Sequence, residues 1–361
     1  MLYHLLYPLH EYSTVFNVFR YITFRTAYAS LTALFLCLFL GPWMIRKLRE
    51  FQVGQQIREE GPASHQGKAG TPTMGGLLVL TSILVPTLLW ADLANPFIWI
   101  CVFALAAFGT VGLLDDYSKV RMRRSLGWSG RRKLLAQIGI ALIIGLCLFY
   151  LRRHGLFDTH LSVPFFKRWT PDLGWWYLGF LVIVIVGSSN AVNLTDGLDG
   201  LAIGAFLIAS AAYTVLAYVA GHAIFSSYLN ITRIAQSGEI TIFCGSMVGA
   251  SLGFLWYNSH PAEIFMGDVG SLALGGAIGT VAVLIKQEIL LLSVGGLFVI
   301  EALSVILQVA SFQLTGKRIF RMAPLHHHFE LAGWKEPKVV VRFWITAIIF
   351  ALLSLSTLKL R

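Results

Sequence analysis

The sequence predicts an all-α integral membrane protein with about ten transmembrane helices, and two observations predict this class. Hydrophobic residues make up 56% of the 361 residues and charged residues 13%, with a mean hydropathy of +0.70, which lies far outside the range of soluble domains. The apolar residues also gather into stretches close to the length of about 20 residues that crosses a hydrocarbon core. Because no internal repeat or soluble domain is evident, residues 1–361 are expected to form a single polytopic membrane domain.

Ten apolar stretches account for the expected spans, and the distribution of Lys and Arg orients them. With the N-terminus outside, 18 of the 28 Lys and Arg residues lie in inside loops or at the inner end of the last span, and 10 lie on the other side. The positive-inside rule therefore predicts that both termini are periplasmic. The net charge of +10 then follows mostly from topology, so no nucleic-acid partner is expected. The stretches cover residues 28–45, 73–91, 96–114, 134–151, 175–194, 201–221, 240–257, 271–285, 289–311 and 339–358.

Acidic residues lie at the boundaries of these stretches. A carboxylate carried into hydrocarbon costs about 2.5 to 3.5 kcal/mol, so a cluster at the boundary indicates function rather than structure alone. Five of the eight aspartates lie within a few residues of the end of a stretch, and the span count puts all five in inside loops together with a run of three histidines. We therefore predict one active site on the cytoplasmic side. The five are Asp115, Asp116, Asp196, Asp199 and Asp268.

The adjacent pair Asp115 and Asp116 closes the third stretch. Two carboxylates at a helix C-terminus oppose the helix dipole, which favours a functional reading over simple termination of the helix in headgroup water. Such a pair can serve as metal ligand, general base or nucleophile. The seven Lys and Arg residues between positions 119 and 133 either offset these acids or hold phosphates.

Residues 190–200 (NAVNLTDGLDG) join the fifth and sixth stretches. Asn193, Asp196 and Asp199 recur every three residues, so on a helical turn they would share a face. The alternative is a polar turn with an Asx cap. Because the loop contains no Lys or Arg, its two aspartates need a metal or a ligand donor such as a nucleobase N–H or a ribose hydroxyl.

Residues 265–271 (FMGDVGS) open the eighth stretch and put Asp268 at a helix N-terminus. Capping alone would explain this position, since the dipole favours an acid there. With Asp115 and Asp116 on the same face of the membrane, Asp268 predicts a divalent-metal site. Carboxylate oxygens without cysteine suit magnesium or manganese rather than zinc.

The last inside loop carries His326, His327 and His328. Three consecutive histidines cannot share one helical face, so the run does not predict a helical zinc triad. Histidines near arginines are suited to donating hydrogen bonds to phosphate or sugar, or to moving protons. On the ninth stretch a polar stripe is explained equally well by interhelical hydrogen bonds and by a groove for a polar lipid head. The stripe consists of Glu301, Ser304, Gln308 and Ser311.

Taken together, these motifs resemble the polyprenyl-phosphate N-acetylhexosamine 1-phosphate transferases over essentially the whole chain. Residues 70–76 (GTPTMGG) and 321–328 (RMAPLHHH) complete the set, and the histidine triplet resembles the muramoyl-pentapeptide branch. The resemblance implies transfer of phospho-MurNAc-pentapeptide from UDP-MurNAc-pentapeptide to undecaprenyl phosphate, which gives lipid I and UMP in peptidoglycan synthesis. It also implies a Mg²⁺ cofactor, a homodimer in the bacterial cytoplasmic (inner) membrane, and nucleoside antibiotics that compete at the uridine site.

The resemblance also implies roles for individual residues. Asp268 would ligate Mg²⁺, Asp115 or Asp116 would act as base or nucleophile, and the ring of Phe265 would lie against the uracil base. The residues implied as catalytic are Asp115, Asp116, Asp268 and His326. Those implied as substrate-binding are Lys68, Thr73, Lys133, Asn193, Asp196, Asp199, Asn258, Phe265, Gln308, His327 and His328.

The acceptor's chemistry favours direct attack on the UDP-sugar over a two-step route through a covalent enzyme intermediate. A phosphate monoester has a second pKa of about 6, so it is mostly a dianion at neutral pH and needs little activation. Two other functions remain as alternatives. One is an N-acetylglucosamine 1-phosphate transferase of the same superfamily. The other is a secondary transporter, which would instead place binding residues near the midplane, commonly in repeated halves.

Overall fold

The computed structural model describes residues 1–51, 70–122, 127–166 and 169–359. In these ranges the regular structure is helical, apart from one isolated β-bridge between His160 and Asp172. Nine of the described helices are long and apolar enough to cross a membrane, and α3 is a shorter apolar helix of 15 residues. All ten predicted stretches therefore form helices, and the predicted all-α membrane fold is confirmed. The orientation of the termini stays a prediction.

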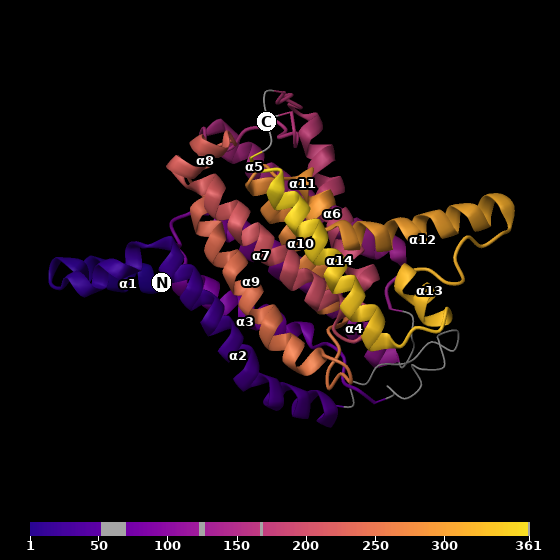
Figure 1. Cartoon of the computed structure of the whole chain (residues 1–361). Helices are drawn as coiled ribbons and strands as arrows, with labels where there is room; N and C mark the ends of the chain where they lie inside the picture. Colours follow the sequence, from indigo (N-terminus) through magenta and orange to yellow (C-terminus); the bar gives the residue numbers. More distant parts are fainter. Residues whose placement is uncertain (52–69, 123–126, 167–168, 360–361) are drawn as a thin grey trace.

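Among the described residues, ten long helices form the body of the protein together with six short helices (Figure 1). The long helices are α2 (Ile22–Glu50), α3 (Gly76–Trp90), α4 (Pro96–Met122), α5 (Gly130–Arg153), α6 (Trp176–Thr195), α7 (Leu201–Gly221), α9 (Ser237–Asn258), α10 (Gly267–Leu284), α12 (Gly296–Thr315) and α14 (Glu336–Ser356). The short ones are α1 (Leu2–Leu6), η1 (Tyr7–Glu11), η2 (Thr14–Arg20), α8 (Ala223–Leu229), α11 (Leu290–Val294) and α13 (Leu325–Leu331).

Helix α10 forms the centre of the bundle. Every residue from Val269 to Leu284 is buried, and the helix packs against α3, α4 and α6. Small residues permit this close packing, as is common where membrane helices meet. A Cβ added to Gly112 in α4 would lie 2.1 Å from the carbonyl oxygen of Asp268, and one added to Gly76 in α3 would lie 2.1 Å from the nitrogen of Gly270. The glycines therefore bring α3 and α4 directly against the first turn of α10.

The ninth stretch, residues 289–311, forms two helices rather than one, and the second of them is long enough to cross a membrane. The chain forms the short helix α11, breaks at Gly295, and continues as α12. Two successive glycines explain the break, because glycine has low helix propensity. In Figure 1, α12 extends away from the other helices toward α13, and its outer half exposes apolar side chains such as Leu307 and Phe312.

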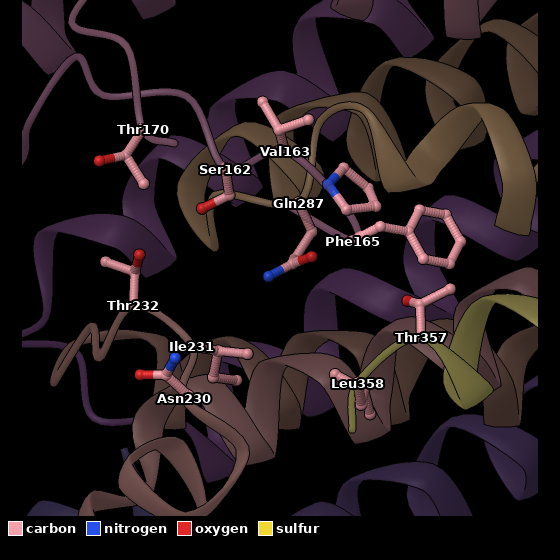
Figure 2. A pocket seen from close by; sticks show the side chains of 11 residues that line it. Ser162, Val163, Phe165, Thr170, Asn230, Ile231, Thr232, Gln287, Thr357 and Leu358 are labelled. Atoms are coloured by element: carbon pink, nitrogen blue, oxygen red, sulfur yellow. The ribbon is translucent and has the colours of Figure 1, made fainter. Parts of the chain in front are cut away.

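A small pocket opens among the loops at the end of the bundle opposite Asp268 (Figure 2). Gln287 follows the last turn of α10, whereas Asp268 begins that helix, so the two lie at opposite ends of it. The pocket has a volume of about 60 Å³, and the described residues that line it are uncharged and include the polar side chains of Ser162, Asn230 and Gln287. Since ligand pockets usually measure about 300 to 1,000 Å³, this pocket is too small for a nucleotide or sugar.

Candidate active site

Three of the boundary aspartates meet where α4 ends and α10 begins. Oxygens of Asp115, Asp116 and Asp268 all lie within 4.8 Å of one another. The backbone N–H of Val269 donates to Asp116 Oδ2 at 3.2 Å, and the N–H of Trp128 donates to Asp115 Oδ1 at 2.7 Å. Asp115 and Asp116 lie about 150 positions before Asp268 in the sequence, yet the three side chains form a single cluster, called the acidic cluster below.

Two lysines neutralise part of this charge. Lys119 Nζ lies 2.7 Å from Asp115 Oδ2, 3.1 Å from Asp116 Oδ1 and 2.8 Å from Asp268 Oδ2. Lys133, in the first turn of α5, has its Nζ 2.6 Å from Asp268 Oδ2 and 3.8 Å from Asp115 Oδ2. The sequence reasoning did not distinguish Lys119 from the other basic residues. Its spacing of three and four residues from the aspartate pair was the signal, because such residues are neighbours on a helix.

Asn193 joins the cluster from α6. Its Nδ2 donates to Asp268 Oδ1 at 2.7 Å and to Ser271 Oγ at 2.8 Å, so the amide and Lys133 hold opposite oxygens of one carboxylate. Gly267 directly before Asp268 has φ +71°, and a Cβ there would lie 2.6 Å from an oxygen of Asp116. Glycine is required because it alone adopts this conformation cheaply and leaves the carboxylate its space.

Residues 70–76 lie beside the same turn through backbone pairing. The N–H of Phe265 donates to the carbonyl of Pro72, and the N–H of Gly75 donates to the carbonyl of Phe265, both at 2.8 Å. Thr73 Oγ1 would lie 3.0 Å from a Cβ on Gly267. Two motifs that are distant in sequence thus bring Thr73 and Phe265 next to the acidic cluster.

The acidic cluster fits a divalent metal. Its possible ligands are carboxylate oxygens from three aspartates, and no cysteine is among them. Hard oxygen ligands of this kind are those that Mg²⁺ and Mn²⁺ prefer. The two lysine ammoniums leave one of the three negative charges uncompensated, which also favours a bound cation.

Asp196 follows the last residue of α6, close enough to the acidic cluster to interact with the charges of Asp268 and Asp116. Burial raises its pKa to about 8, and the negative charges of Asp268, Asp116 and Asp199 raise it further in the same direction. The carboxyl group is therefore mostly protonated at neutral pH when no cation neutralises the cluster, and a protonated carboxyl group can both donate and accept hydrogen bonds.

His326 is fully buried between α12 and the loop after α6. Its Nδ1 lies 3.2 Å from Glu301 Oε2, and a Cβ added to Gly197 would lie 2.2 Å from its Nε2. Nε2 has no hydrogen-bond partner among the described residues. Glu301, one of the polar residues predicted as a stripe on the ninth stretch, thus contacts His326.

Asp199 forms a second cluster that the sequence reasoning missed. Its Oδ2 lies 3.1 Å from His260 Nδ1 and accepts a hydrogen bond from the N–H of Ala262 at 3.1 Å. Glu336 Oε2 lies 3.6 Å from the same His260 nitrogen. No spacing in the sequence relates these three side chains, because they come from three separate loops and helix ends.

Asn258 and Gln308 bind the protein's own backbone in this structure. Asn258 Oδ1 accepts from the N–H of Gly200 at 3.1 Å and its Nδ2 donates to the carbonyl of Ile264 at 2.8 Å, which joins the loop after α6 to the residues before Phe265. Gln308 binds backbone groups of residues 319 and 320. Their predicted contacts with substrate stay predictions.

The other two histidines stabilise α13. His327 Nδ1 lies 2.8 Å from Glu330 Oε2, and His328 Nδ1 accepts from the backbone N–H of Arg321 at 3.1 Å. The predicted phosphate ligand Lys68 lies outside the described residues. Of the predicted residues, the structure thus brings Thr73, Lys133, Asn193 and the backbone of Phe265 next to the three aspartates of the acidic cluster, while the histidines, Asn258, Gln308 and Asp199 have other partners.

Comparisons with known proteins agree with this arrangement. A profile described as Glycosyl transferase family 4 matches residues 98–286, and the Phospho-N-acetylmuramoyl-pentapeptide-transferase signature 1 matches residues 68–80. Three curated relatives carry the name phospho-N-acetylmuramoyl-pentapeptide-transferase, and each aligns over 100% of its own length and 100% of this chain. They come from Koribacter versatilis (61% identical), Solibacter usitatus (60%) and Desulfosudis oleivorans (62%).

A polytopic helical bundle with carboxylates and lysines at one end, matched by this profile, defines a membrane phosphoglycosyl transferase. Full-length identity near 60% to the named relatives identifies the family within this class. The chain belongs to the phospho-N-acetylmuramoyl-pentapeptide transferase family. The prediction of lipid I synthesis is thereby confirmed, and the runner-up readings of an N-acetylglucosamine 1-phosphate transferase and a transporter gain no support.

Proposed function

We propose that the acidic cluster and its two lysines are the reaction centre at which phospho-MurNAc-pentapeptide passes from its UDP carrier to undecaprenyl phosphate. One observation supports this above all others. Three carboxylates from α4 and α10 meet at one end of the bundle, and the ammonium groups of Lys119 and Lys133 each lie within hydrogen-bond distance of at least one of them. Such a centre suits a reaction between two anions, since it offers both cation ligands and fixed positive charge.

Asp268 is the principal magnesium ligand in this proposal, with Asp115 and Asp116 beside it. A bound Mg²⁺ would supply charge neutralisation and alignment for the phosphate oxygens. Asn193 and Lys133 each hold one oxygen of Asp268 and so fix the direction in which that carboxylate presents its lone pairs. Lys119 and Lys133 lower the repulsion between the acceptor phosphate and the diphosphate of the donor.

The acceptor attacks the donor directly. An oxygen of undecaprenyl phosphate forms a bond to the phosphorus attached to the sugar, the phosphoanhydride bond breaks, and UMP leaves with the electron pair. Asp115 or Asp116 accepts the remaining proton when the acceptor arrives as a monoanion. The two-step alternative makes one of these aspartates the nucleophile, and a labelled phospho-enzyme trapped without lipid acceptor would establish that route instead.

The nucleoside is held by the loop after α6 and by Phe265. Asp196 offers a carboxyl group to the uracil or ribose, and the Phe265 ring, which is partly exposed, offers a stacking surface. Asp199, whose buried carboxylate pairs with His260 and the N–H of Ala262, supports the same loop from behind. His326, His327, His328, Thr73, Asn258, Gln308 and Lys68 complete the proposed contacts to phosphates, sugar and peptide.

A UMP-release assay tests the proposal. The purified protein receives UDP-MurNAc-pentapeptide with and without undecaprenyl phosphate, and with Mg²⁺ or a chelator. We expect UMP only when donor, acceptor and metal are all present. Release of UMP without acceptor would favour the covalent route, and full turnover in the chelator would remove the metal from the proposal.

Three further expectations belong to the same proposal. The protein acts in the bacterial inner membrane with the acidic cluster on the cytoplasmic side, it forms a homodimer, and nucleoside antibiotics compete with the donor at the uridine subsite. Cysteine labelling from either side of inverted vesicles, native mass and competition binding with UMP measure these three properties separately.

A further inference from the structure

A pair of side-chain amides joins α5 to α6 one helical turn deeper in the bundle than the acidic cluster. Asn190 Nδ2 donates to Gln137 Oε1 at 2.6 Å, and Gln137 Nε2 lies 3.5 Å from Asn190 Oδ1. Asn190 Nδ2 also donates to the carbonyl of Val186 at 2.8 Å. Gln137 is fully buried, and among the described residues its side-chain hydrogen bonds go to Asn190 rather than to the reaction centre. Its amide is thus a polar contact without a role in the chemistry proposed above.

The position of Gln137 on α5 connects it with Lys133. The buried face of α5 is a stripe in which Gln137 is the only polar member, and Lys133 precedes it by four residues on the same face. The opposite face of the helix exposes large apolar side chains such as Leu135 and Leu146. The stripe consists of Gln137, Ala141, Ile144, Gly145, Leu148 and Leu151.

Helix α6, in contrast, is attached to the central helix independently of α5. Ser188 Oγ donates to the carbonyl of Gly275 at 2.8 Å, and Ser189 Oγ donates to the carbonyl of Leu272 at 3.0 Å. In the part of the chain that the structure describes, the amide pair supplies the hydrogen bonds between α5 and α6. The amide pair therefore connects α5 to α6, a helix that its own hydrogen bonds already hold against α10.

An apolar stripe alone would hold α5 weakly in register. Lipid tails are as apolar as leucine, so no hydrophobic force opposes sliding or rotation of a helix within the membrane. A slip of one residue moves a helix by about 1.5 Å and turns it by about 100°, which would carry Lys133 away from Asp268. Reciprocal amide hydrogen bonds form in one register only, as buried polar residues do in coiled coils.

We infer that Gln137 is a positioning residue for Lys133: by pairing with Asn190 it sets the register of α5 that brings the ammonium group to Asp268. The inference rests on the proposed function of Lys133 and Asp268. It assigns a role in the reaction to a side chain that contacts neither substrate nor metal. If this role is correct, replacing Gln137 lowers turnover only in a protein that has Lys133. A general contribution of Gln137 to stability would not depend on Lys133.

Gln137→Met tests the inference, because methionine has a similar unbranched shape but cannot form the amide pair. We expect kcat to fall by about 10- to 100-fold, the loss typical of a reacting group displaced by about 1 Å. In a Lys133→Met background the same substitution should cost less than about twofold, since its target is gone. Leu148→Ala, on the same stripe three turns further along, is the matched control and should leave kcat of the folded protein unchanged.

A labelling measurement reads the position of Lys133 without activity. Lys133 paired with Asp268 should react slowly with acetic anhydride, and Gln137→Met should raise its rate several-fold relative to Lys119 in the same protein. The exchanged pair Gln137→Asn with Asn190→Gln keeps two amides and should restore both the slow labelling and the turnover. Leu148→Ala should leave the labelling ratio at the wild-type value.

The outcomes separate this inference from the proposed function. Full activity of Lys133→Met would remove Lys133 from the reaction centre, while the labelling rates of Lys133 in the wild type and in Gln137→Met would still report whether Gln137 positions it. An inactive Lys133→Met together with wild-type labelling and turnover of Gln137→Met would overturn the positioning role. Equal losses from Gln137→Met in both backgrounds would overturn it as well.

Discussion

Gly197, in the loop after α6, lies directly against the imidazole of His326 in α13. A Cβ on Gly197 would fall 2.2 Å from His326 Nε2, while Glu301 Oε2 lies 3.2 Å from Nδ1 on the other side of the ring. The histidine is therefore held between the loop after α6 and α12. Its position depends on the absence of a side chain more than 120 residues earlier in the sequence.

Gly197→Ala should for this reason displace His326 or the loop. We expect a loss of about 1 to 3 kcal/mol in stability, the usual cost of overpacking a buried site, and a clear fall in UMP release. Gly187→Ala, in α6 with nothing within 4 Å of the added Cβ, is the control and should be tolerated. If Gly197→Ala had the melting temperature and turnover of the wild type, the loop would accommodate the added methyl group without loss of stability, which would contradict the prediction.

Asp268→Asn should remove nearly all turnover while the protein stays folded. The amide keeps the shape of the side chain but loses the charge that pairs with Lys119 and Lys133 and that a cation needs. UMP release at saturating Mg²⁺, with the melting temperature as a check on folding, measures this. Substantial turnover under those conditions would argue against the metal assignment.

Phe265→Ala should weaken the binding of UMP. If the ring stacks on uracil, the loss is about 1 to 3 kcal/mol, the range measured for bases stacked on aromatic side chains. Isothermal titration calorimetry with UMP gives the affinity directly, without the peptide or lipid substrate. Because the backbone of Phe265 pairs with Pro72 and Gly75, the substitution leaves those hydrogen bonds in place. An unchanged affinity would exclude Phe265 from the nucleoside site.

Asp196 should make the metal-free protein less stable as pH rises. Burial raises its pKa to about 8 in the folded state, against about 3.9 in an unfolded chain. Between these values the folded state keeps a proton that the unfolded state has released, so the free energy of unfolding falls with increasing pH. Asp196→Asn lacks this titration. The difference between its melting temperature and that of the wild type should therefore shift in favour of the variant as pH rises from about 5 to about 8.

Asp172→Asn provides a control of opposite sign. Hydrogen bonds from Thr159 and from the N–H of Gly174 lower the pKa of Asp172, so its contribution to stability is present at neutral pH and is lost as pH falls. The melting temperature of this variant should therefore lie below that of the wild type at neutral pH and approach it in acid. Parallel pH curves for wild type and Asp196→Asn would contradict the raised pKa.

The fold was largely predictable because it depends on local composition. Each apolar stretch is long enough to satisfy its own backbone hydrogen bonds as a helix in lipid, whatever its neighbours do. The break between α11 and α12 was missed, although two successive glycines mark it, because hydropathy averages over a window and is insensitive to a single hinge.

The site was predictable to the level of its residue types and its end of the bundle. Loop parity and charge indicated that Asp115, Asp116 and Asp268 would meet, and they do. The contacts of Asn258 and Gln308 with backbone groups, and the cluster of Asp199 with His260 and Glu336, had no signal in the sequence. These contacts join residues from separate loops, and no local pattern encodes such a distance.

The sequence by itself therefore determined a helical membrane protein of this enzyme family, and it predicted the end of the bundle and the acids that we propose for its chemistry. Only the tertiary structure decided which lysine reaches which carboxylate, that Asn193 orients Asp268, and that Gln137 lies behind Lys133. The physical reason is that helix formation in lipid is a property of each segment. The rotation and depth of one helix against another are set by glycine contacts and a few polar pairs, which exist only once the bundle has packed.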